Sequence, residues 1–212
     1  MNPYFKKIAL GFPFTYFGVL SRIIDKKAAT ILDIGCGRGE STAILNYHGN
    51  YQIVGVDGFR PYLSECKKKG FYRDLLHADV SKLPFKKKSF DIVLCLQVIE
   101  HLPKEKGFEL LSAMEEICKK QIIISTPVGM YGQDEYDGNP LQEHKSFWLP
   151  NDFKKLGYRV IGQGLRLLYG EKSRVESFGP AAGLLSFFAC FLHPLLQFFP
   201  HQAAQMICVK NV

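Results

Sequence analysis

The stretch Ile31-Leu-Asp-Ile-Gly-Cys-Gly-Arg-Gly-Glu40 joins a short apolar run to three glycines at alternate positions. The apolar run predicts a buried strand, and the glycines predict a tight turn that opens a helix. Glycines let the backbone approach a ligand closely, and the N–H groups at a helix N-terminus are free to bind it. The spacing Gly-x-Gly-x-Gly differs from the Gly-x-Gly-x-x-Gly fingerprint of dinucleotide-binding dehydrogenases.

Apolar runs alternate with amphipathic stretches around this turn, a pattern typical of βαβ units and a parallel sheet. The expected strands are Thr30–Ile34, Gln52–Val56, Tyr72–His77, Phe90–Leu96, Gln121–Ser125, Tyr158–Gln163 and Gln205–Lys210. The expected helices are Gly39–Tyr47, Pro61–Lys69, Pro150–Leu156 and Lys104–Cys118, the last with Phe108, Leu111, Met114 and Ile117 at helical spacing. Val128–Ser146 is rich in Gly, Asp, Asn and Gln and predicts a long loop, and such loops are usually functional or mobile.

Acidic residues stand at the ends of three successive predicted strands. Asp33 lies just before the glycine turn, Asp57 closes the second strand, and Asp79 follows the third. Each acid alone could be a turn or helix-cap residue. Together, at one edge of a sheet, they can contact three parts of one nucleoside ligand. Asp33 would repel a pyrophosphate but suits a cationic ligand.

With these features the sequence resembles the class I S-adenosylmethionine-dependent methyltransferases, in particular the type 11 group of small-molecule methyltransferases. The resemblance covers Lys27 to Lys155 and the last strand. Its matching pieces are Leu32-Asp-Ile-Gly-Cys-Gly-Arg-Gly39, Val54-Gly-Val-Asp57, Ala78-Asp-Val80, Leu83-Pro-Phe85, Ser89-Phe-Asp-Ile-Val93 and Val98-Ile-Glu-His-Leu102. It implies a Rossmann-like α/β fold with a seven-stranded, mostly parallel sheet of order 3-2-1-4-5-7-6, an antiparallel last strand, and helices on both faces.

The resemblance also implies a cofactor, S-adenosylmethionine, which leaves as S-adenosylhomocysteine. It assigns cofactor contacts to Asp33, Gly35, Cys36, Gly37, Asp57, Gly58, Asp79, Val80 and Gln97. Asp33 would lie near the methionine ammonium, and the glycine turn would pass beneath the carboxylate and ribose. Asp57 would bind the ribose hydroxyls. Asp79 and Val80 would face the adenine, and Gln97 would lie beside the sulfonium and the substrate.

Two histidines are the candidate catalytic bases. A sulfonium already carries the activation for methyl transfer, so a protein mainly positions the partners and excludes water. An oxygen or carbon acceptor can also need a base. His101 stands at the mouth of the fourth predicted strand, and His144 lies in the long loop. Alternatively, His101 only orients the loop by hydrogen bonds and His144 packs at the base of a lid.

A metal site is a further alternative at this place. Small-RNA 2′-O-methyltransferases have a similar Glu-x-x-Glu-His motif that binds a divalent metal together with a later His. Here Gln97 replaces the first acid, ahead of Glu100, His101 and His144. A neutral amide is a poor ligand for a hard cation. We therefore predict no metal and, since no basic-aromatic motif occurs elsewhere, no nucleic-acid substrate.

Composition indicates one globular domain over residues 1–212, with 47% hydrophobic and 22% charged residues. We expect an N-terminal helical lid or extension at 1–26, a core at 27–165 and 203–212, and an apolar helical insertion at 174–200. The net charge of +7 favours anionic partners or simply solubility. None of the six cysteines forms a Cys-x-x-Cys pair, which favours a reduced, cytoplasmic protein without disulfides or structural zinc.

Two apolar stretches bear on membranes. Lys6 and Lys7 precede the first, Ile8–Leu20, but polar residues and Pro13 interrupt it and no cleavage site follows, so we expect no signal peptide. The second, Ala181–Phe199, is nineteen residues without a charge. It lies between two predicted strands of one sheet, so we expect no membrane span. Two interpretations stay open: peripheral contact with the inner face of a membrane, or a cover over the acceptor pocket or a homodimer interface.

These features predict methyl transfer from S-adenosylmethionine to a small, lipophilic acceptor whose reacting atom the sequence leaves open. A non-catalytic, S-adenosylmethionine-binding partner subunit is the main alternative. An NAD-dependent oxidoreductase and a metal-dependent RNA 2′-O-methyltransferase are less well supported by the motifs.

Overall fold

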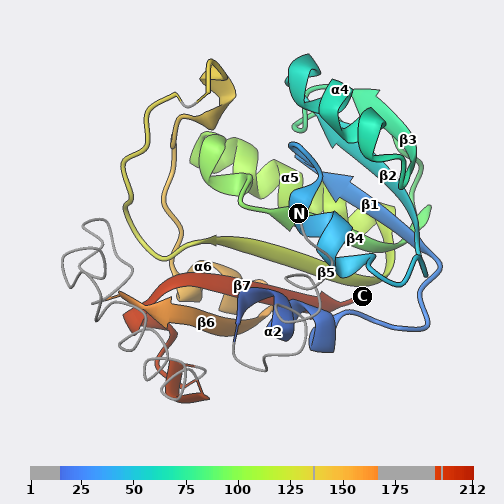
Figure 1. The fold of residues 1–212 in the computed structure, drawn as a ribbon. Helices are drawn as coiled ribbons and strands as arrows, with labels where there is room; N and C mark the ends of the chain where they lie inside the picture. Colours follow the sequence, from blue (N-terminus) through green and yellow to red (C-terminus); the bar gives the residue numbers. More distant parts are fainter. Residues whose placement is uncertain (1–14, 136, 167–193, 197) are drawn as a thin grey trace, which may run out of the picture.

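The computed structural model describes residues 15–135, 137–166, 194–196 and 198–212. Its centre is a seven-stranded sheet with the order β3-β2-β1-β4-β5-β7-β6 (Figure 1). The strands are β1 (Thr30–Ile34), β2 (Gln52–Asp57), β3 (Tyr72–His77), β4 (Phe90–Leu96), β5 (Cys118–Pro127), β6 (Arg159–Leu165) and β7 (Ala203–Asn211). β1 to β5 pair in parallel, and β7 runs antiparallel to both of its neighbours. The predicted order and the antiparallel last strand are confirmed.

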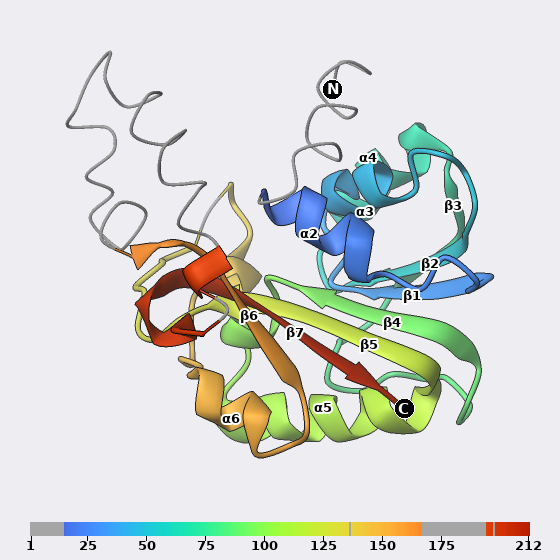
Figure 2. The ribbon, with the colours of Figure 1, turned by 90° about the horizontal axis from the view of Figure 1, so that it is seen from below.

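Helices cover both faces of the sheet. They are α2 (Tyr16–Ile23), α3 (Glu40–Leu45), α4 (Arg60–Lys69), α5 (Lys104–Ile117) and α6 (Pro150–Lys154), with short 3-10 helices at Ile99–His101, Pro140–Gln142 and Pro200–Gln202. Figure 2 shows α2, α3 and α4 on one face and α5 and α6 on the other.

The central strand β4 shows why this sequence forms a two-faced layer. Ile92 and Leu94 pack into the core beneath α2, whereas Val93 and Cys95 pack into the core beneath α5. Successive side chains of a strand point to opposite faces, so a strand that is covered on both sides needs a continuous apolar run. Burial of this run fixes β4 in the middle of the sheet and brings its carboxyl end, with the residues that follow it, to the sheet edge.

Helix α5 departs from its predicted packing at one residue. Leu111, Met114 and Ile117 are buried as predicted, but Phe108 is 42% exposed. Gly107 is buried in its place, because a Cβ there would lie only 2.4 Å from the ring of Trp148. Phe108 instead lies edge-on to Trp148 with 5.2 Å between ring centroids. The indole therefore takes the core position that the helical spacing assigned to Phe108.

Only parts of the two predicted apolar segments fall within the described residues. α2 lies inside the predicted N-terminal extension, while residues 1–14 lie outside the described part. Most of the predicted insertion 174–200 also lies outside it, including 181–193. At its end, Phe198 and Phe199 are 78% and 64% exposed. Among the described residues, no helix combines the length and the apolar character needed to cross a membrane.

Candidate functional site

Two cavities lie at the carboxyl-terminal edge of the sheet. The first, which we call the glycine-turn cavity, has a volume of about 380 Å³, and the second, the glutamine cavity, about 420 Å³. Residues from both the turn after β1 and the ends of β2 and β3 line the glycine-turn cavity. Gln97, directly after β4, lines both cavities. The two spaces therefore adjoin at this residue.

The turn after β1 forms a bare backbone wall of the glycine-turn cavity. Gly35, Gly37 and Gly39 have φ angles of +65°, +54° and +71°, a left-handed conformation that favours glycine. A Cβ on Gly35 would lie 2.4 Å from the side chain of Val98, whereas a Cβ on Gly37 would meet nothing within 4 Å. At Gly37, a ligand can thus contact the main chain itself.

Asp57 ties this turn to the end of β2. Its Oδ2 accepts a 2.8 Å hydrogen bond from the Gly37 N–H, and its Oδ1 accepts one of 2.8 Å from the Phe59 N–H. Burial raises the pKa of the Asp57 carboxyl, while these two N–H donors act in the opposite direction. A carboxylate has about four lone-pair positions, so two stay available for neighbouring hydroxyls of a ligand. This arrangement fits a ribose diol.

Asp79 and Val80 lie further along the same cavity wall, as the sequence predicts. The Ser81 N–H donates a 2.9 Å hydrogen bond to Asp79 Oδ1, and it is the main reason why the pKa of that carboxyl is lowered. Asp79 therefore stays a charged hydrogen-bond acceptor. Val80 and Leu102 add apolar wall beside it. An acceptor next to an apolar wall suits a flat heteroaromatic ring with an amino group.

Two predicted cofactor residues lie behind the cavity wall. Asp33 is 3% exposed and is not among the described residues that line the cavity. Its Oδ2 accepts hydrogen bonds of 2.6 Å from both Thr42 Oγ1 and Tyr72 Oη, and burial raises its pKa to about 6. The Cys36 side chain is also buried, and the Cys36 N–H donates to the Val56 carbonyl at 3.0 Å. Both residues brace the turn, and direct cofactor contacts by them stay predictions.

Gln97 is held in an uncommon conformation. Its φ is +57°, and left-handed backbone at a residue other than glycine is concentrated at functional sites. Its main-chain N–H donates to the Ser125 carbonyl at 2.9 Å. Its amide Nε2 donates to Ser125 Oγ at 3.1 Å and to Gln205 Oε1 at 3.3 Å. These bonds fix the side chain that separates the two cavities.

The predicted long loop covers the glycine-turn cavity and contributes four wall residues that the sequence did not single out, namely Asn139, Leu141, Gln142 and Lys145. Trp148 is fully buried and anchors the end of the loop, where its carbonyl accepts a 2.8 Å hydrogen bond from the Gly129 N–H. Asn139 is 1% exposed, and its Oδ1 accepts from the Leu141 N–H. In the sequence, the turn signal Gly138-Asn-Pro140 could have pointed to this part of the loop.

The two candidate bases lie side by side, but only His101 lines a cavity among the described residues. The His101 and His144 ring centroids are 4.9 Å apart. Their Nδ1 atoms contact the carbonyls of Glu143 at 3.1 Å and Tyr131 at 2.7 Å. A carbonyl only accepts, so each Nδ1 carries a proton and donates it to that carbonyl. Burial lowers the pKa of His101, which keeps its ring neutral.

Glu100 joins this histidine pair. It is 2% exposed, and burial raises its pKa to about 7. Ligand atoms of Glu100, His101 and His144 lie within 4.8 Å of one another, so these described residues could hold a divalent cation. The expectation that the protein works without a metal stays a prediction.

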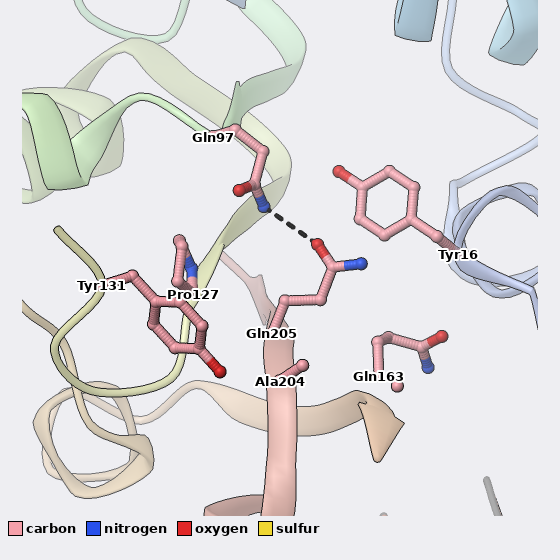
Figure 3. Close-up of a pocket in the computed structure, with 8 residues that line it drawn as sticks. Tyr16, Gln97, Pro127, Tyr131, Gln163, Ala204 and Gln205 are labelled. Carbon is pink, nitrogen blue, oxygen red and sulfur yellow. Dashed lines mark hydrogen bonds between the residues drawn. The ribbon is translucent and has the colours of Figure 1, made fainter. Parts of the chain in front are cut away.

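The glutamine cavity was not foreseen from the sequence (Figure 3). Its described walls are Tyr16, Gln97, Pro127, Tyr131, Gln163, Gly164, Ala204 and Gln205. Gln163 and Gln205 stand directly opposite each other in the β6–β7 ladder. The available signal was a glutamine inside an apolar run of each of two strands, at 160–165 and at 203–209. Its meaning depends on how those two strands pair, which the sequence does not state.

Comparison with known proteins places these features in a family. The profile described as "Methyltransferase domain" matches residues 32–122. An uncharacterized protein of Methanocaldococcus jannaschii is 32% identical over 68% of this chain and 60% of its own length. The ubiquinone biosynthesis O-methyltransferase of Rickettsia prowazekii is 26% identical over 63% of this chain and 54% of its own length. The chain thus spans a little over half the length of these curated relatives.

A solved structure agrees over the whole chain. The S-adenosylmethionine-dependent methyltransferase of Archaeoglobus fulgidus has a TM-score of 0.59 at 20% identity, covering 99% of this chain and 100% of that one. At this identity the likeness establishes the fold. Together with the family profile over residues 32–122 and the strand order, it shows a methyltransferase domain with the fold of the class I S-adenosylmethionine-dependent methyltransferases.

S-adenosylmethionine is the cofactor of this class, and the residues present fit it. The open backbone at Gly37 leaves room for the ligand, Asp57 keeps free lone pairs for ribose hydroxyls, and Asp79 offers an acceptor for the adenine amino group. Two carboxylates on the cavity wall also suit a ligand with a sulfonium and an ammonium group. No pyrophosphate would be favoured there.

Proposed function

We propose that this protein transfers the methyl group of S-adenosylmethionine to a small, lipophilic acceptor. The observation that carries the proposal is Gln97, which lines both the cavity that fits the cofactor and the adjoining glutamine cavity. A methyl donor and its acceptor must meet in line, so adjoining cavities that share one wall residue suit this reaction. The name of the Rickettsia relative supports oxygen as the acceptor atom.

When bound, S-adenosylmethionine would supply an activated methyl group to the acceptor oxygen, with S-adenosylhomocysteine as the leaving group. The acceptor oxygen loses its proton in the same step. His101 is the proposed proton acceptor, because its ring lines the glycine-turn cavity and burial lowers its pKa. His144, in contact with the His101 ring, is proposed as a positioning residue.

Isothermal titration calorimetry with S-adenosylhomocysteine and with NAD tests the cofactor assignment. We expect one site for S-adenosylhomocysteine and none for NAD. Binding of NAD without binding of S-adenosylhomocysteine would overturn the proposal in favour of an oxidoreductase. Binding of S-adenosylhomocysteine combined with no methyl transfer to any acceptor would favour the non-catalytic partner subunit.

We also propose that this protein is cytoplasmic and contacts a membrane surface peripherally through residues 181–199. The exposed rings of Phe198 and Phe199 and the net charge of +7 support it. Co-sedimentation with phosphatidylglycerol vesicles tests it, with phosphatidylcholine vesicles as the control. Binding should require the anionic lipid and weaken in Phe198→Ser. If the protein stays in the supernatant and elutes as a dimer, the apolar segment is a homodimer interface instead.

A further inference from the structure

The glutamine cavity has an uncharged but polar lining. Among the described residues that line it, none carries a charged or imidazole side chain, while three amides and two phenols face it. Burial raises the pKa of Tyr16, and its hydroxyl is 2.7 Å from Ser125 Oγ, so this phenol stays neutral. An ionised ligand placed here would lose its hydration without gaining a counter-ion, which is costly. The lining therefore selects uncharged occupants.

Gln163 presents an unmatched acceptor to this cavity. It is 3% exposed, and its Nε2 donates to the Gly162 carbonyl at 3.0 Å. Its Oε1 is buried and has no hydrogen-bond partner within the described part of the chain. Leaving a buried acceptor unpaired costs about 1–3 kcal/mol. An occupant that donates a hydrogen bond to this oxygen removes that cost.

Gln205 presents the complementary group. It is the cross-strand partner of Gln163, and its Oε1 is already used by the Gln97 amide at 3.3 Å. The nitrogen of the Gln205 amide has no hydrogen bond to the residues that the structure describes, so it can donate to a ligand (Figure 3). Directly opposed cross-strand residues have Cβ atoms about 4.5–5.5 Å apart. One hydroxyl group between the two amides can donate to Gln163 and accept from Gln205.

The remaining walls suit a flat ring. Figure 3 shows Tyr16 and Tyr131 on either side of the hydrogen bond between Gln97 and Gln205. Aromatic rings in contact stabilise one another by about 0.5–1.5 kcal/mol beyond the area they bury. Pro127 and Ala204 complete the apolar lining. The volume of about 420 Å³ accommodates one or two fused rings with a substituent.

We propose that the glutamine cavity binds an uncharged, hydroxyl-bearing aromatic ring compound, with the hydroxyl held between Gln163 and Gln205. Only the statement that this compound is the methyl acceptor rests on the proposed function; the binding itself does not. Gln205 is in turn bonded to Gln97, which lines both cavities, so one amide connects the proposed hydroxyl site to the wall of the glycine-turn cavity.

The test uses 2-naphthol, a fluorescent and uncharged phenol, titrated into protein saturated with S-adenosylhomocysteine. Naphthalene lacks the hydroxyl, 2-methoxynaphthalene has a methyl group in place of the hydroxyl hydrogen, and 2-naphthoate is an anion. We expect 2-naphthol to bind at least about tenfold more tightly than each of the three, the factor that corresponds to one buried hydrogen bond. Equal or tighter binding of 2-naphthoate or of naphthalene would overturn the proposal.

A substitution at Gln163 tests whether the preference for 2-naphthol depends on the amides of Gln163 and Gln205. Gln163→Met keeps the length of the side chain and removes the acceptor, so the affinity for 2-naphthol should fall about tenfold while that for naphthalene should not weaken. Gln202→Met, on the exposed 3-10 helix before β7, is the matched control and should change neither. A Gln163→Met protein with wild-type preference for 2-naphthol would contradict the inference.

Titration of S-adenosylhomocysteine into each variant separates the two proposals. Unchanged affinity in Gln163→Met shows that the variant is folded and that the glycine-turn cavity is intact. If wild-type protein fails to bind S-adenosylhomocysteine, the proposed function fails. If it binds S-adenosylhomocysteine but does not prefer 2-naphthol over the other three probes, only the inference about the glutamine cavity fails.

Discussion

The main-chain N–H of Gly37 donates a 2.8 Å hydrogen bond to Oδ2 of Asp57. This bond joins the turn after β1 to the end of β2, twenty positions further along the chain. The same carboxylate is also bound by the Phe59 N–H through its other oxygen. Asp57 is therefore both a brace for the glycine turn and a ligand-facing group, and its loss should affect cofactor binding more than folding.

Asp57→Ala should weaken S-adenosylhomocysteine binding by at least about tenfold, because a charged hydrogen-bond acceptor is lost from the cavity wall. Isothermal titration calorimetry measures the effect. Asp74→Ala, which removes an exposed carboxylate from β3, is the matched control and should bind as the wild type does. Unchanged affinity in Asp57→Ala would refute the ribose assignment.

Asp33 should make the stability of the fold depend on pH. Burial raises its pKa from 3.8 to about 6 in the folded protein, so folding favours the protonated form. The stability that this group contributes is present below pH 3.8 and is lost as the pH rises through about 6. A rise of this size corresponds to about 3 kcal/mol.

Urea unfolding of wild type and Asp33→Asn between pH 4 and pH 7 measures this effect. The free energy of unfolding of the wild type should fall relative to that of the variant by up to about 3 kcal/mol over this range. The pKa of Glu100 is also raised, to about 7, but Glu100 is present in both proteins. Its contribution to the pH dependence therefore cancels when the two free energies of unfolding are subtracted. A difference that is constant with pH would show that Asp33 is ionised at low pH in the folded protein.

Leu141 should slow the release of the cofactor product. It lines the glycine-turn cavity from the covering loop, and its Cδ1 lies 2.8 Å from the position of a Cβ on Gly58. Leu141→Ala should raise the dissociation rate of S-adenosylhomocysteine about fivefold, the effect of losing about 1 kcal/mol of half-buried apolar contact. Surface plasmon resonance measures it, with Leu156→Ala as control. Equal rates in all three proteins would mean that this leucine does not close the cavity.

The parts of the fold that the sequence predicted are those set by local pattern. The apolar run at β4 and the glycines after β1 determine their own conformation, since burial on two faces and left-handed φ angles leave few alternatives. The positions of Asp57 and Asp79 on the cavity wall follow, because each stands at or just after the end of such a strand. Asp33 shows what a local pattern does not predict. Its side chain accepts hydrogen bonds from Thr42 and Tyr72, and this orientation depends on how those residues pack around the turn.

The glutamine cavity could not be predicted in the same way. Its walls come from α2, from the residue after β4, and from β6 and β7, so it exists only after distant segments pair. Within the sequence, Gln163 and Gln205 are single polar residues in apolar runs. Their shared face follows from the register of an antiparallel pair whose connection is long. Phe108 was misplaced for a related reason, because Trp148 reaches its site from the covering loop.

His101 should shape the pH dependence of methyl transfer to 2-naphthol. Its pKa lies below the ordinary value of 6.5, so the wild-type rate should level off above that pH. His101→Gln should lower the rate at least about a hundredfold at neutral pH. Without a base, transfer depends on ionised naphthol, and the rate should rise about tenfold per pH unit from pH 5 to pH 8. Formation of S-adenosylhomocysteine measures both profiles, and a variant that keeps the plateau would exclude His101 as the base.

Chelation should leave the reaction unchanged. Glu100, His101 and His144 offer three ligand atoms, but a neutral amide, Gln97, stands in the place of a second acid and donates to Ser125 and Gln205. The cofactor itself carries the activation, so no Lewis acid is needed. Protein dialysed against EDTA should therefore keep its methyl transfer rate and its affinity for S-adenosylhomocysteine. A rate lost on dialysis and restored by Mn²⁺ in wild type, but not in His144→Ala, would instead establish a metal centre at this triad.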